Sequence, residues 1–363
     1  MSCRKTLSKY RSVSHYNLFG LNFIKNFSNQ NKDYLLICGF ETFDNIIIRI
    51  DILERLFLKI IELSKQYKFE LNSEILNLLG CTKDDFKELM KKINYKSAGV
   101  DINAGNEAVD LIKEGVASTF TPNVLTGLGS FGSLYDLKPI LNKYDHPVMV
   151  QSIDGVGTKT IIARKMNKFD TIGIDLLSAA ANDILVMGAK PLTFLDYIAN
   201  DKLKPKIVEQ IVSGMVKACR DTGVSLVGGE TAEMPDTYLP GEHDLVGVIT
   251  GIVEKDKIIT GEKIRPGNVL VGLPSNGLHT NGYSFARKLF FDVGGYNVND
   301  CPDELESSVG NTLLMPHINY TKHVLGILNA GINLNGIIHI TGGGLLENIP
   351  RVLPKGMAVE INR

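Results

Sequence analysis

Apolar side chains recur at helical spacing early in the chain. One set falls at i, i+3, i+4, i+7 and i+8, so it covers a single stripe of a helix that begins near residue 51. A second helix is expected after Thr82, because Asp85 stands three residues on, as in an N-terminal cap, and apolar positions follow at helical spacing. We therefore predict a small helical module over residues 33–94. The first stripe consists of Leu53, Leu56, Phe57, Ile60 and Ile61.

This module has the outline of a helix-turn-helix nucleic-acid reader, with Gly80 at the turn between residues 73 and 93. The lysines of its last helix alternate with acidic residues, so the helix has no basic face for a phosphate backbone. We favour a packing or docking module. The lysines are Lys83, Lys87, Lys91 and Lys92, and the acidic residues are Asp84, Asp85 and Glu88.

Beyond residue 94, short Val/Ile/Leu runs alternate with glycine-rich turns and helical stretches, a texture typical of α/β and α+β folds. The Pro266-Gly267 turn before a fresh apolar run marks the expected boundary between two domains, 95–262 and 263–363. The expected strands are Val148–Ser152, Leu192–Ile198, Val224–Val227, Leu245–Val253 and Val269–Leu273, and the expected helices are Leu176–Met187, Lys206–Asp221 and Tyr283–Phe290.

Composition narrows the class of protein. The 363 residues, 44% of them hydrophobic, can bury a substantial core. The 39 basic and 40 acidic side chains nearly cancel, so overall charge favours neither nucleic acid nor a membrane as partner. No apolar run reaches the ~20 residues that a membrane-spanning helix needs. The five cysteines are scattered without a CxxC pair, which is typical of a reducing compartment, and we expect the protein in the cytoplasm.

The first 32 residues carry basic side chains without a single Asp or Glu. A disordered tail explains this bias, and so does a transit peptide that would direct the protein to an organelle. Both interpretations stay open.

The turn Asp154-Gly155-Val156-Gly157-Thr158-Lys159 directly follows an apolar strand. Glycines let backbone N–H groups approach phosphate oxygens, an aspartate can hold Mg²⁺, and a lysine can neutralise a phosphate. The motif lacks the spacing of a P-loop. It therefore reads either as a triphosphate cradle or as a tight structural turn.

Polar residues also interrupt the Ala-rich helix expected after Asp175, which stands where an N-cap would. Asn182 and Asp183 fall inside this helix, and a buried carboxylate needs partners. Asp175 and Asp183 would lie about 12 Å apart along the axis, too far to share one ion. We expect Asp183 to bind a metal ion.

A third motif, GGETAEMP, follows the strand that ends at Val227. Gly228 and Gly229 permit the close approach of a ligand. The carboxylates of Glu230 and Glu233 are suited to binding a metal ion or to acting as a general base. A charged surface turn explains the same residues equally well.

Two polar loops open after apolar runs nearer the C-terminus. SNGLHTNGYS carries His279 and Asn281 at the start of a helix, where exposed amides bind anions. HITGGG places His339 beside three glycines. Either histidine could instead be structural.

Together these motifs resemble the aminoimidazole ribonucleotide synthetase family. The similarity runs from Tyr95 to Pro354 and includes the SAGVD-INAGN start and GGETAEMP. The resemblance implies an α+β fold of two domains. It further implies that the N-terminal domains of a homodimer pair into a β-barrel and that each active site draws on both subunits.

The resemblance also implies the reaction. Using ATP and Mg²⁺, such an enzyme activates the formyl-amide oxygen of formylglycinamidine ribonucleotide as a phosphoryl imidate, and a nitrogen of the same molecule displaces phosphate to close the imidazole ring. By motif, Asp154 and Asp183 would bind Mg²⁺, Lys159 would contact phosphate, Lys113, Gly127, Gly129 and Gly132 would border the nucleotide, and His279, Asn281 and His339 would lie at the reacting groups. The remaining cofactor-binding candidates are Gly155, Gly157, Thr158, Asp175, Asn182, Gly228, Gly229 and Glu230.

The chain departs from the family pattern at both ends. It stops at Arg363, where the family continues, so we expect an incomplete C-terminal α/β domain. Residues 1–94 have no counterpart in the simple bacterial enzyme. The alternative function is that of a catalytically weak nucleotide-binding or assembly protein of the same family. Selenophosphate synthetase, a relative that needs a reactive cysteine in its early glycine loop, is disfavoured because no cysteine lies between Cys81 and Cys219.

Overall fold

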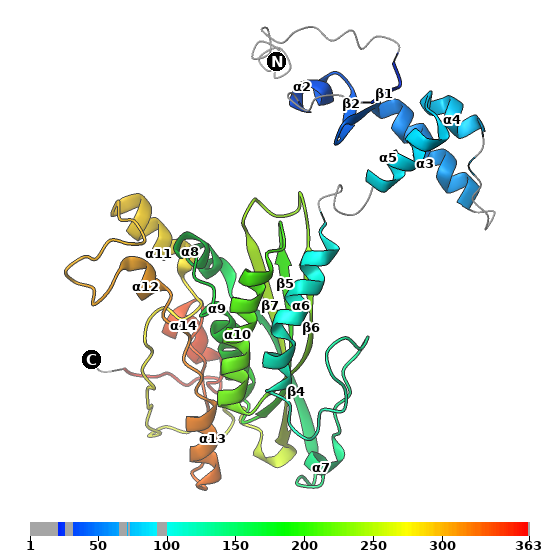
Figure 1. The fold of residues 1–363 in the computed structure, drawn as a ribbon. Coiled ribbons are helices and arrows are strands. Elements are labelled where there is room, and N and C mark those ends of the chain that lie inside the picture. Colours follow the sequence, from blue (N-terminus) through cyan, green and yellow to red (C-terminus); the bar gives the residue numbers. More distant parts are fainter. Residues whose placement is uncertain (1–20, 26–31, 65–70, 72, 93–99, 362–363) are drawn as a thin grey trace. The chain divides into compact units, whose positions relative to one another are not determined.

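The computed structural model describes residues 21–25, 32–64, 71, 73–92 and 100–361. The chain divides into two units, Met1–Gly99 and Val100–Arg363 (Figure 1). Most of the basic N-terminal segment and the first residues of SAGVD lie outside the described residues. Because Val100–Arg363 is one unit, the domain boundary that we expect at residue 262 remains a prediction.

The first unit combines helices with a small sheet that the helical pattern did not predict. Its antiparallel sheet has the order β1-β3-β2. The apolar stripe lies on α3 as expected, with Leu56 buried but Phe57 41% exposed. Thr82 caps α5 through its hydroxyl, which accepts from the Asp85 N–H. The elements are β1 (Phe23–Lys25), α2 (Lys32–Ile37), β2 (Phe40–Phe43), β3 (Ile46–Arg49), α3 (Ile50–Ser64), α4 (Ser73–Leu79) and α5 (Lys83–Lys92).

The second unit is built on a four-stranded sheet of order β4-β7-β5-β6. Strands β5 and β6 are parallel, and the other two pairs are antiparallel. Four of the predicted strands and both long predicted helices are confirmed. The sheet is open in the part of the chain described. The predicted barrel would need the sheets of two subunits, so it stays a prediction. The elements are α6 (Ile102–Ala117), α7 (Lys138–Leu141), β4 (Pro147–Gly155), η1 (Gly157–Lys159), α8 (Thr160–Met166), α9 (Ile172–Leu185), β5 (Lys190–Asn200), α10 (Pro205–Thr222), β6 (Ser225–Glu233), β7 (His243–Glu254) and η2 (Lys255–Lys257).

One face of this sheet is covered by helices (Figure 1). The small side chains of α9 are almost all buried, which lets that helix lie against β4, β5 and β7. Helices α9 and α10 cross closely through two glycines. A Cβ at Gly173 would lie 2.0 Å from the Ile211 carbonyl oxygen, and a Cβ at Gly214 would lie 2.2 Å from that of Asp170.

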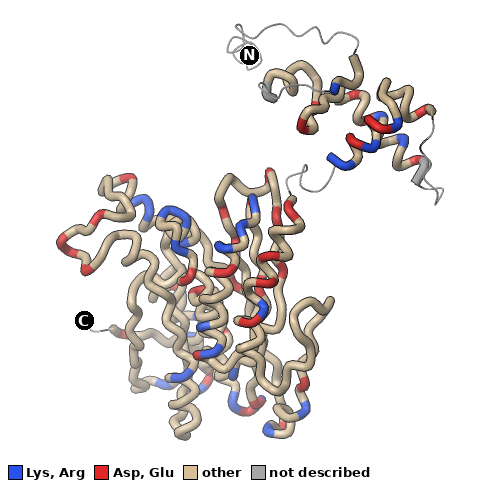
Figure 2. The backbone as a smooth tube through the Cα atoms, in the orientation of Figure 1, with Lys and Arg blue, Asp and Glu red and all other residues tan. Residues whose placement is uncertain are grey.

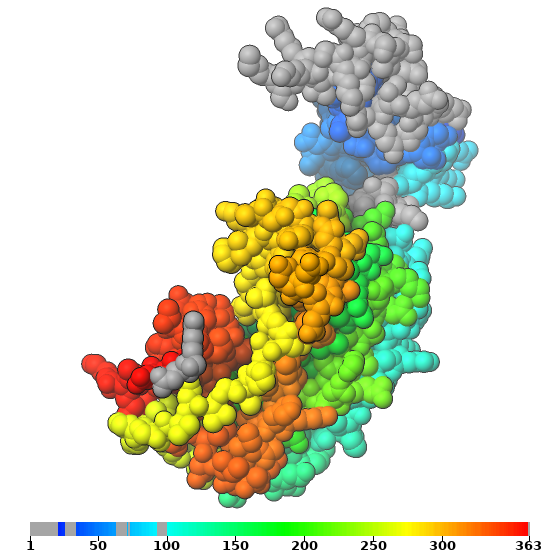
Figure 3. Space-filling model, turned by 90° about the vertical axis from the view of Figure 1, so that its left-hand side faces the viewer, coloured from blue at the N-terminus to red at the C-terminus, as the bar shows by residue number. Residues whose placement is uncertain are grey.

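The segment after β7 forms the surface seen in yellow to red in Figure 3. Its helical elements are α11 (Tyr283–Arg287), η3 (Lys288–Val293, a π-helical turn), α12 (Val309–Leu313), α13 (Thr321–Asn329), α14 (Gly344–Asn348) and η4 (Ile349–Arg351).

The predicted strand Val269–Leu273 is wrong, and the described residues beyond η2 contain no strand. A strand exists only where its backbone groups pair with another strand. Here Val269 is 86% exposed and Val271 is 79% exposed, so the apolar run pairs with no strand in the described part of the chain. The predicted helix at Tyr283–Phe290 is confirmed as α11 and the start of η3.

Charges of both signs are interspersed along both units (Figure 2). Among the described residues, no helix combines the length and apolarity that crossing a bilayer requires.

The close crossing of α9 and α10 generates a stability prediction. Gly214→Ala should destabilise the protein by about 1–3 kcal/mol or more, because the new methyl overlaps backbone that cannot yield without parting the helices. Gly105→Ala in α6 is the matched control: nothing lies within 4 Å of its Cβ position, and it should stabilise by up to about 1 kcal/mol. Chemical denaturation measures both. Equal stability of the two variants would contradict this account of the crossing.

Candidate active site

The turn after β4 is shaped by its glycines. The Asp154 carboxylate accepts a hydrogen bond from the Gly155 N–H at 2.7 Å, and Gly157 has a φ of +63°, which favours glycine. Burial raises the pKa of Asp154, and the nearby Asp183 carboxylate raises it further. A buried carboxylate whose charge is disfavoured by a second carboxylate nearby forms a site that a cation would stabilise.

The last residue of that turn, Lys159, forms a fully buried ion pair with Asp175. The ammonium lies 2.9 and 2.8 Å from the two carboxylate oxygens, and both side chains are 0% exposed. Burial raises the pKa of Asp175 to about 6 and lowers that of Lys159, although each charge opposes the shift of the other. The predicted N-cap role of Asp175 is wrong, since α9 begins at Ile172 with Thr171 before it.

This ion pair joins three parts of the unit. The Lys159 ammonium also donates to the backbone carbonyls of His279 at 3.0 Å and Met315 at 2.7 Å. Asp175 accepts from the backbone N–H of His317 at 2.7 Å. All N–H groups of the Lys159 ammonium are thus directed at protein oxygens, so the structure shows a cross-link where we predicted a phosphate contact.

Next to this ion pair, the rings of three histidines from three different loops lie close together. The rings of His279 and His317 stack, with their centroids 4.1 Å apart and an angle of 21° between their planes. The ring centroid of His339 lies 5.4 Å from that of His317, with an angle of 52° between the planes. Burial lowers the pKa of His279 to about 4 and that of His317 to about 2, with neighbouring cationic groups adding to the effect. Both rings are therefore neutral near pH 7.

His339 connects the histidines to the carboxylates. Its Nδ1 lies 2.8 Å from one oxygen of Asp183, whose other oxygen accepts from the Ser152 hydroxyl at 3.0 Å. The structure therefore brings Asp154, Asp183 and His339 together, from β4, α9 and the loop before α14.

The polar loops that we singled out also meet here. The side-chain amide oxygen of Asn281 accepts from the Gly342 N–H at 3.2 Å, joining SNGLHTNGYS to the triple-glycine turn. The Thr158 hydroxyl lies 3.3 Å from that of Ser284 at the start of α11.

Other predicted residues lie in β6, in α6 and in the loop after α6. Gly228, Gly229 and Glu230 belong to β6, which continues into the motif that we had placed after the end of the strand. Glu233 accepts from the backbone N–H groups of Asp101 at 2.5 Å and Leu203 at 3.0 Å, which is a structural role. Lys113 is exposed on α6, and Gly127, Gly129 and Gly132 lie in an exposed loop. Their nucleotide contacts remain predictions.

Sequence reasoning missed His317. It stands in no motif, between α12 and α13, and only the fold brings it against His279. Asn182 was singled out, but as a cofactor contact. Its amide instead donates to Ile318 O at 2.9 Å and accepts from the Tyr320 N–H at 3.0 Å, so it holds the same loop.

Comparisons with known proteins identify the family of the chain. The model of the AIR synthase related protein, N-terminal domain, matches residues 140–253, and that of the C-terminal domain matches residues 265–363. A phosphoribosylformylglycinamidine cyclo-ligase from Alkaliphilus oremlandii is 50% identical over 271 residues, covering 75% of this chain and 79% of that protein. The cyclo-ligase of Geobacter metallireducens is 50% identical over 273 residues, covering 75% and 78%.

Solved structures with similarity to the chain include thiamine-monophosphate kinase from Stenotrophomonas maltophilia, with a TM-score of 0.45 and 17% identity over 60% of this chain and 63% of that one. The hydrogenase maturation protein HypE in complex with ATP has a TM-score of 0.38 and 20% identity over 63% and 58%. The domain matches and the half-identical relatives confirm the resemblance read from the motifs. The chain belongs to the AIR synthase family, that of the phosphoribosylformylglycinamidine cyclo-ligases.

Proposed function

We propose that this chain closes the imidazole ring of aminoimidazole ribonucleotide from formylglycinamidine ribonucleotide at the expense of ATP. The observation that carries the proposal is the convergence of Asp154, Asp183 and His339 beside the stacked His279 and His317. The cyclo-ligase relatives support the same reaction.

The chemistry explains why such a site suffices. The γ-phosphoryl group of ATP passes to the formyl-amide oxygen, and ADP leaves. A nitrogen of the same molecule then attacks the activated carbon, phosphate departs with that oxygen, and the nitrogen loses a proton. Phosphoryl transfer mainly needs positioning and charge neutralisation, and ring closure within one bound molecule already benefits from proximity.

Mg²⁺ fits the carboxylate end of the site. Asp154 and Asp183 supply the oxygen ligands that Mg²⁺ prefers, and the effect of one on the pKa of the other shows that their charges interact. No cluster of three or more His, Cys, Asp or Glu side chains forms a complete metal site in the described part of the chain. Phosphate oxygens of ATP and water would complete the shell, and the ion would neutralise the transferring phosphoryl group.

His279 is the residue that we assign to proton movement. Its ring is neutral near pH 7, because its pKa is lowered to about 4, so one ring nitrogen has a free lone pair for a proton, although this low pKa makes the ring a weak base. Its Nε2 is buried without a hydrogen-bond partner among the described residues. Lys113, Gly127, Gly129 and Gly132 keep the proposed role of bordering the nucleotide.

We further propose that the open face of the sheet is the interface with a second copy of this chain. Ile153 and Leu195 both lie directly opposite Val248 on β7, so the three side chains share one face. Ile153 is 67% exposed and Leu195 is 41% exposed. Met149, on the same face of β4, is 67% exposed. Such an apolar sheet face is typical of an interface between subunits.

Turnover tests the proposed reaction. The purified chain with ATP, Mg²⁺ and formylglycinamidine ribonucleotide should form aminoimidazole ribonucleotide and ADP in equal amounts. Oxygen-18 placed in the formyl group should appear in phosphate. ATP hydrolysis without label in phosphate would refute the proposal.

Asp183→Asn should weaken Mg-ATP binding at least about tenfold, since even outer-shell changes cost metal sites on the order of 10- to 100-fold. Asp256→Asn, which changes an exposed carboxylate in η2, is the control.

Light scattering tests the proposed dimer. The wild-type chain should have the mass of two copies at micromolar concentration, and Ile153→Glu should have the mass of one, because it buries a charge between the sheets. Val109→Glu, at a 45% exposed position on α6, should remain dimeric. A monomeric wild type would rule out the interface.

A further inference from the structure

His317 occupies the centre of the histidine cluster without belonging to any motif. It is 2% exposed, stacks on His279 and contacts His339. Its backbone N–H is bound to Asp175. The question is what its ring does there.

The hydrogen bonds around the ring determine its tautomer. The Asn182 side chain has its oxygen on the Tyr320 N–H and its nitrogen on the Ile318 carbonyl, and a carbonyl only accepts. The same Asn182 nitrogen lies 3.1 Å from His317 Nε2, so it donates and Nε2 accepts. A neutral ring that accepts at Nε2 carries its proton on Nδ1. That Nδ1 lies 3.3 Å from the Thr280 hydroxyl, to which it donates.

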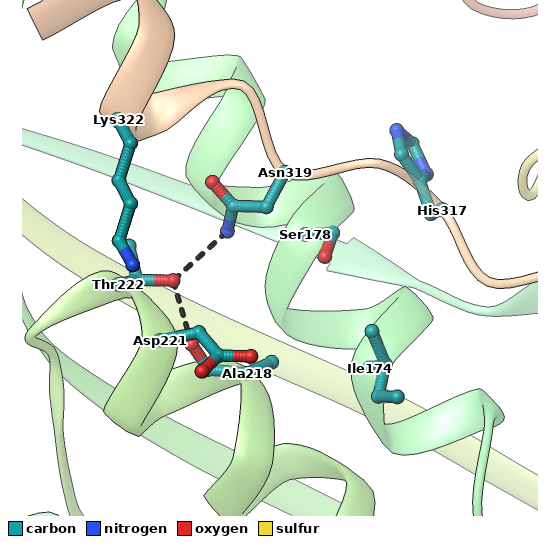
Figure 4. A pocket seen from close by; sticks show the side chains of 8 residues that line it. All are labelled: Ile174, Ser178, Ala218, Asp221, Thr222, His317, Asn319 and Lys322. Carbon is teal, nitrogen blue, oxygen red and sulfur yellow. Dashed lines mark hydrogen bonds between the residues drawn. The ribbon is translucent and has the colours of Figure 1, made fainter. Parts of the chain in front are cut away.

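Directed hydrogen bonds hold this ring in addition to packing. His317 lines a cavity of about 440 Å³ between α9, α10 and the start of α13 (Figure 4). The side chains of Ser178, Thr222, Asn319 and Lys322 line the same cavity. The His317 side chain is only 2% exposed, so neighbouring atoms surround the ring, and the two hydrogen bonds and the stack on His279 set its orientation within that packing.

Thr280 stands between His279 and Asn281, the two residues of this loop that we place at the reacting groups. His279 has a φ of +56°, a backbone conformation that a histidine rarely adopts and that its surroundings must maintain. The Lys159 ammonium donates a hydrogen bond to the backbone carbonyl oxygen of His279. The Thr280 hydroxyl is the next point along the loop at which it can be held.

We propose that His317 is a positioning residue that, as its neutral Nδ1–H tautomer, links Asn182 of α9 to Thr280 and thereby aims His279 at the substrate. This inference rests on the proposed function for its catalytic consequence, but not for its structural content. Both ring nitrogens of His317 are engaged, so the residue acts through His279 and does not exchange protons itself.

Variants that keep different parts of the ring test the link. His317→Phe keeps a stacking ring and loses both hydrogen bonds. It should lower kcat on the order of 100-fold, the cost of misplacing a reacting group by about 1 Å, while KM for ATP stays within about twofold. His317→Asn places an amide N–H near the position of Nδ1 and should recover about tenfold of that loss by donating to Thr280.

Thr280→Val, which removes the hydroxyl at constant shape, should resemble His317→Phe. The double variant should be no slower than the slower single variant, because the two residues act as one unit. His323→Phe on the exposed face of α13 should leave kcat unchanged. Independent, multiplicative losses, or wild-type kcat in His317→Phe, would overturn the proposal.

A measurement without turnover separates this inference from the proposed function. In wild-type protein with nitrogen-15 in its histidines, long-range NMR should show His317 protonated at Nδ1 and unprotonated at Nε2 near neutral pH. Thr280→Val should shift the Nδ1 signal. The opposite tautomer would overturn the positioning role even in an active enzyme. The predicted tautomer in a chain that closes no ring would leave the link intact and reject only the reaction.

Discussion

The buried ion pair between Lys159 and Asp175 is the interaction on which the site depends. Moving two charges out of water costs several kcal/mol per ion unless each finds partners. Here the partners are backbone groups: the carbonyls of His279 and Met315 for the ammonium, and the N–H of His317 for the carboxylate. Because neither charge can be left unpaired, these three points of the C-terminal segment are fixed against α9 and the turn after β4.

The chemistry follows from that arrangement. The same backbone points carry the rings of His279 and His317, so the pair that holds the loops also holds the two stacked rings in a buried position, and burial keeps both rings neutral. His339 approaches from a third loop and contacts Asp183, at the carboxylate end of the site. A reaction that consists of phosphoryl transfer followed by ring closure needs this kind of positioning more than it needs a strong nucleophile. The half-identical cyclo-ligase relatives support an enzyme over the assembly protein that we kept as an alternative.

Sequence reasoning was most successful where local pattern decides structure. Apolar runs predicted β4 to β7, and glycine turns and polar insertions drew attention to Asp154, Asp183, His279 and His339, which the fold brings together. It failed where distant partners decide. The run Val269–Leu273 is apolar like the four confirmed strands but pairs with no described strand. Lys159 ends a glycine turn that predicts a phosphate contact, and this contact stays a prediction. The pairing of its ammonium with Asp175 could not be predicted, because nothing local reveals that partner. His317 becomes recognisable only once α9 and two loops surround it, because its role consists entirely of contacts with residues far along the chain.

Hydrogen exchange measured on the chain without nucleotide tests the central claim most directly. If the ion pair holds the loops, Lys159→Met should speed amide exchange in residues 276–282 and 314–318 at least about tenfold, since these amides would open locally, while β5 and α10 keep their protection. A lysine that serves only to contact phosphate would leave exchange unchanged when no nucleotide is present. Unchanged protection of both loops in the variant would therefore contradict the account.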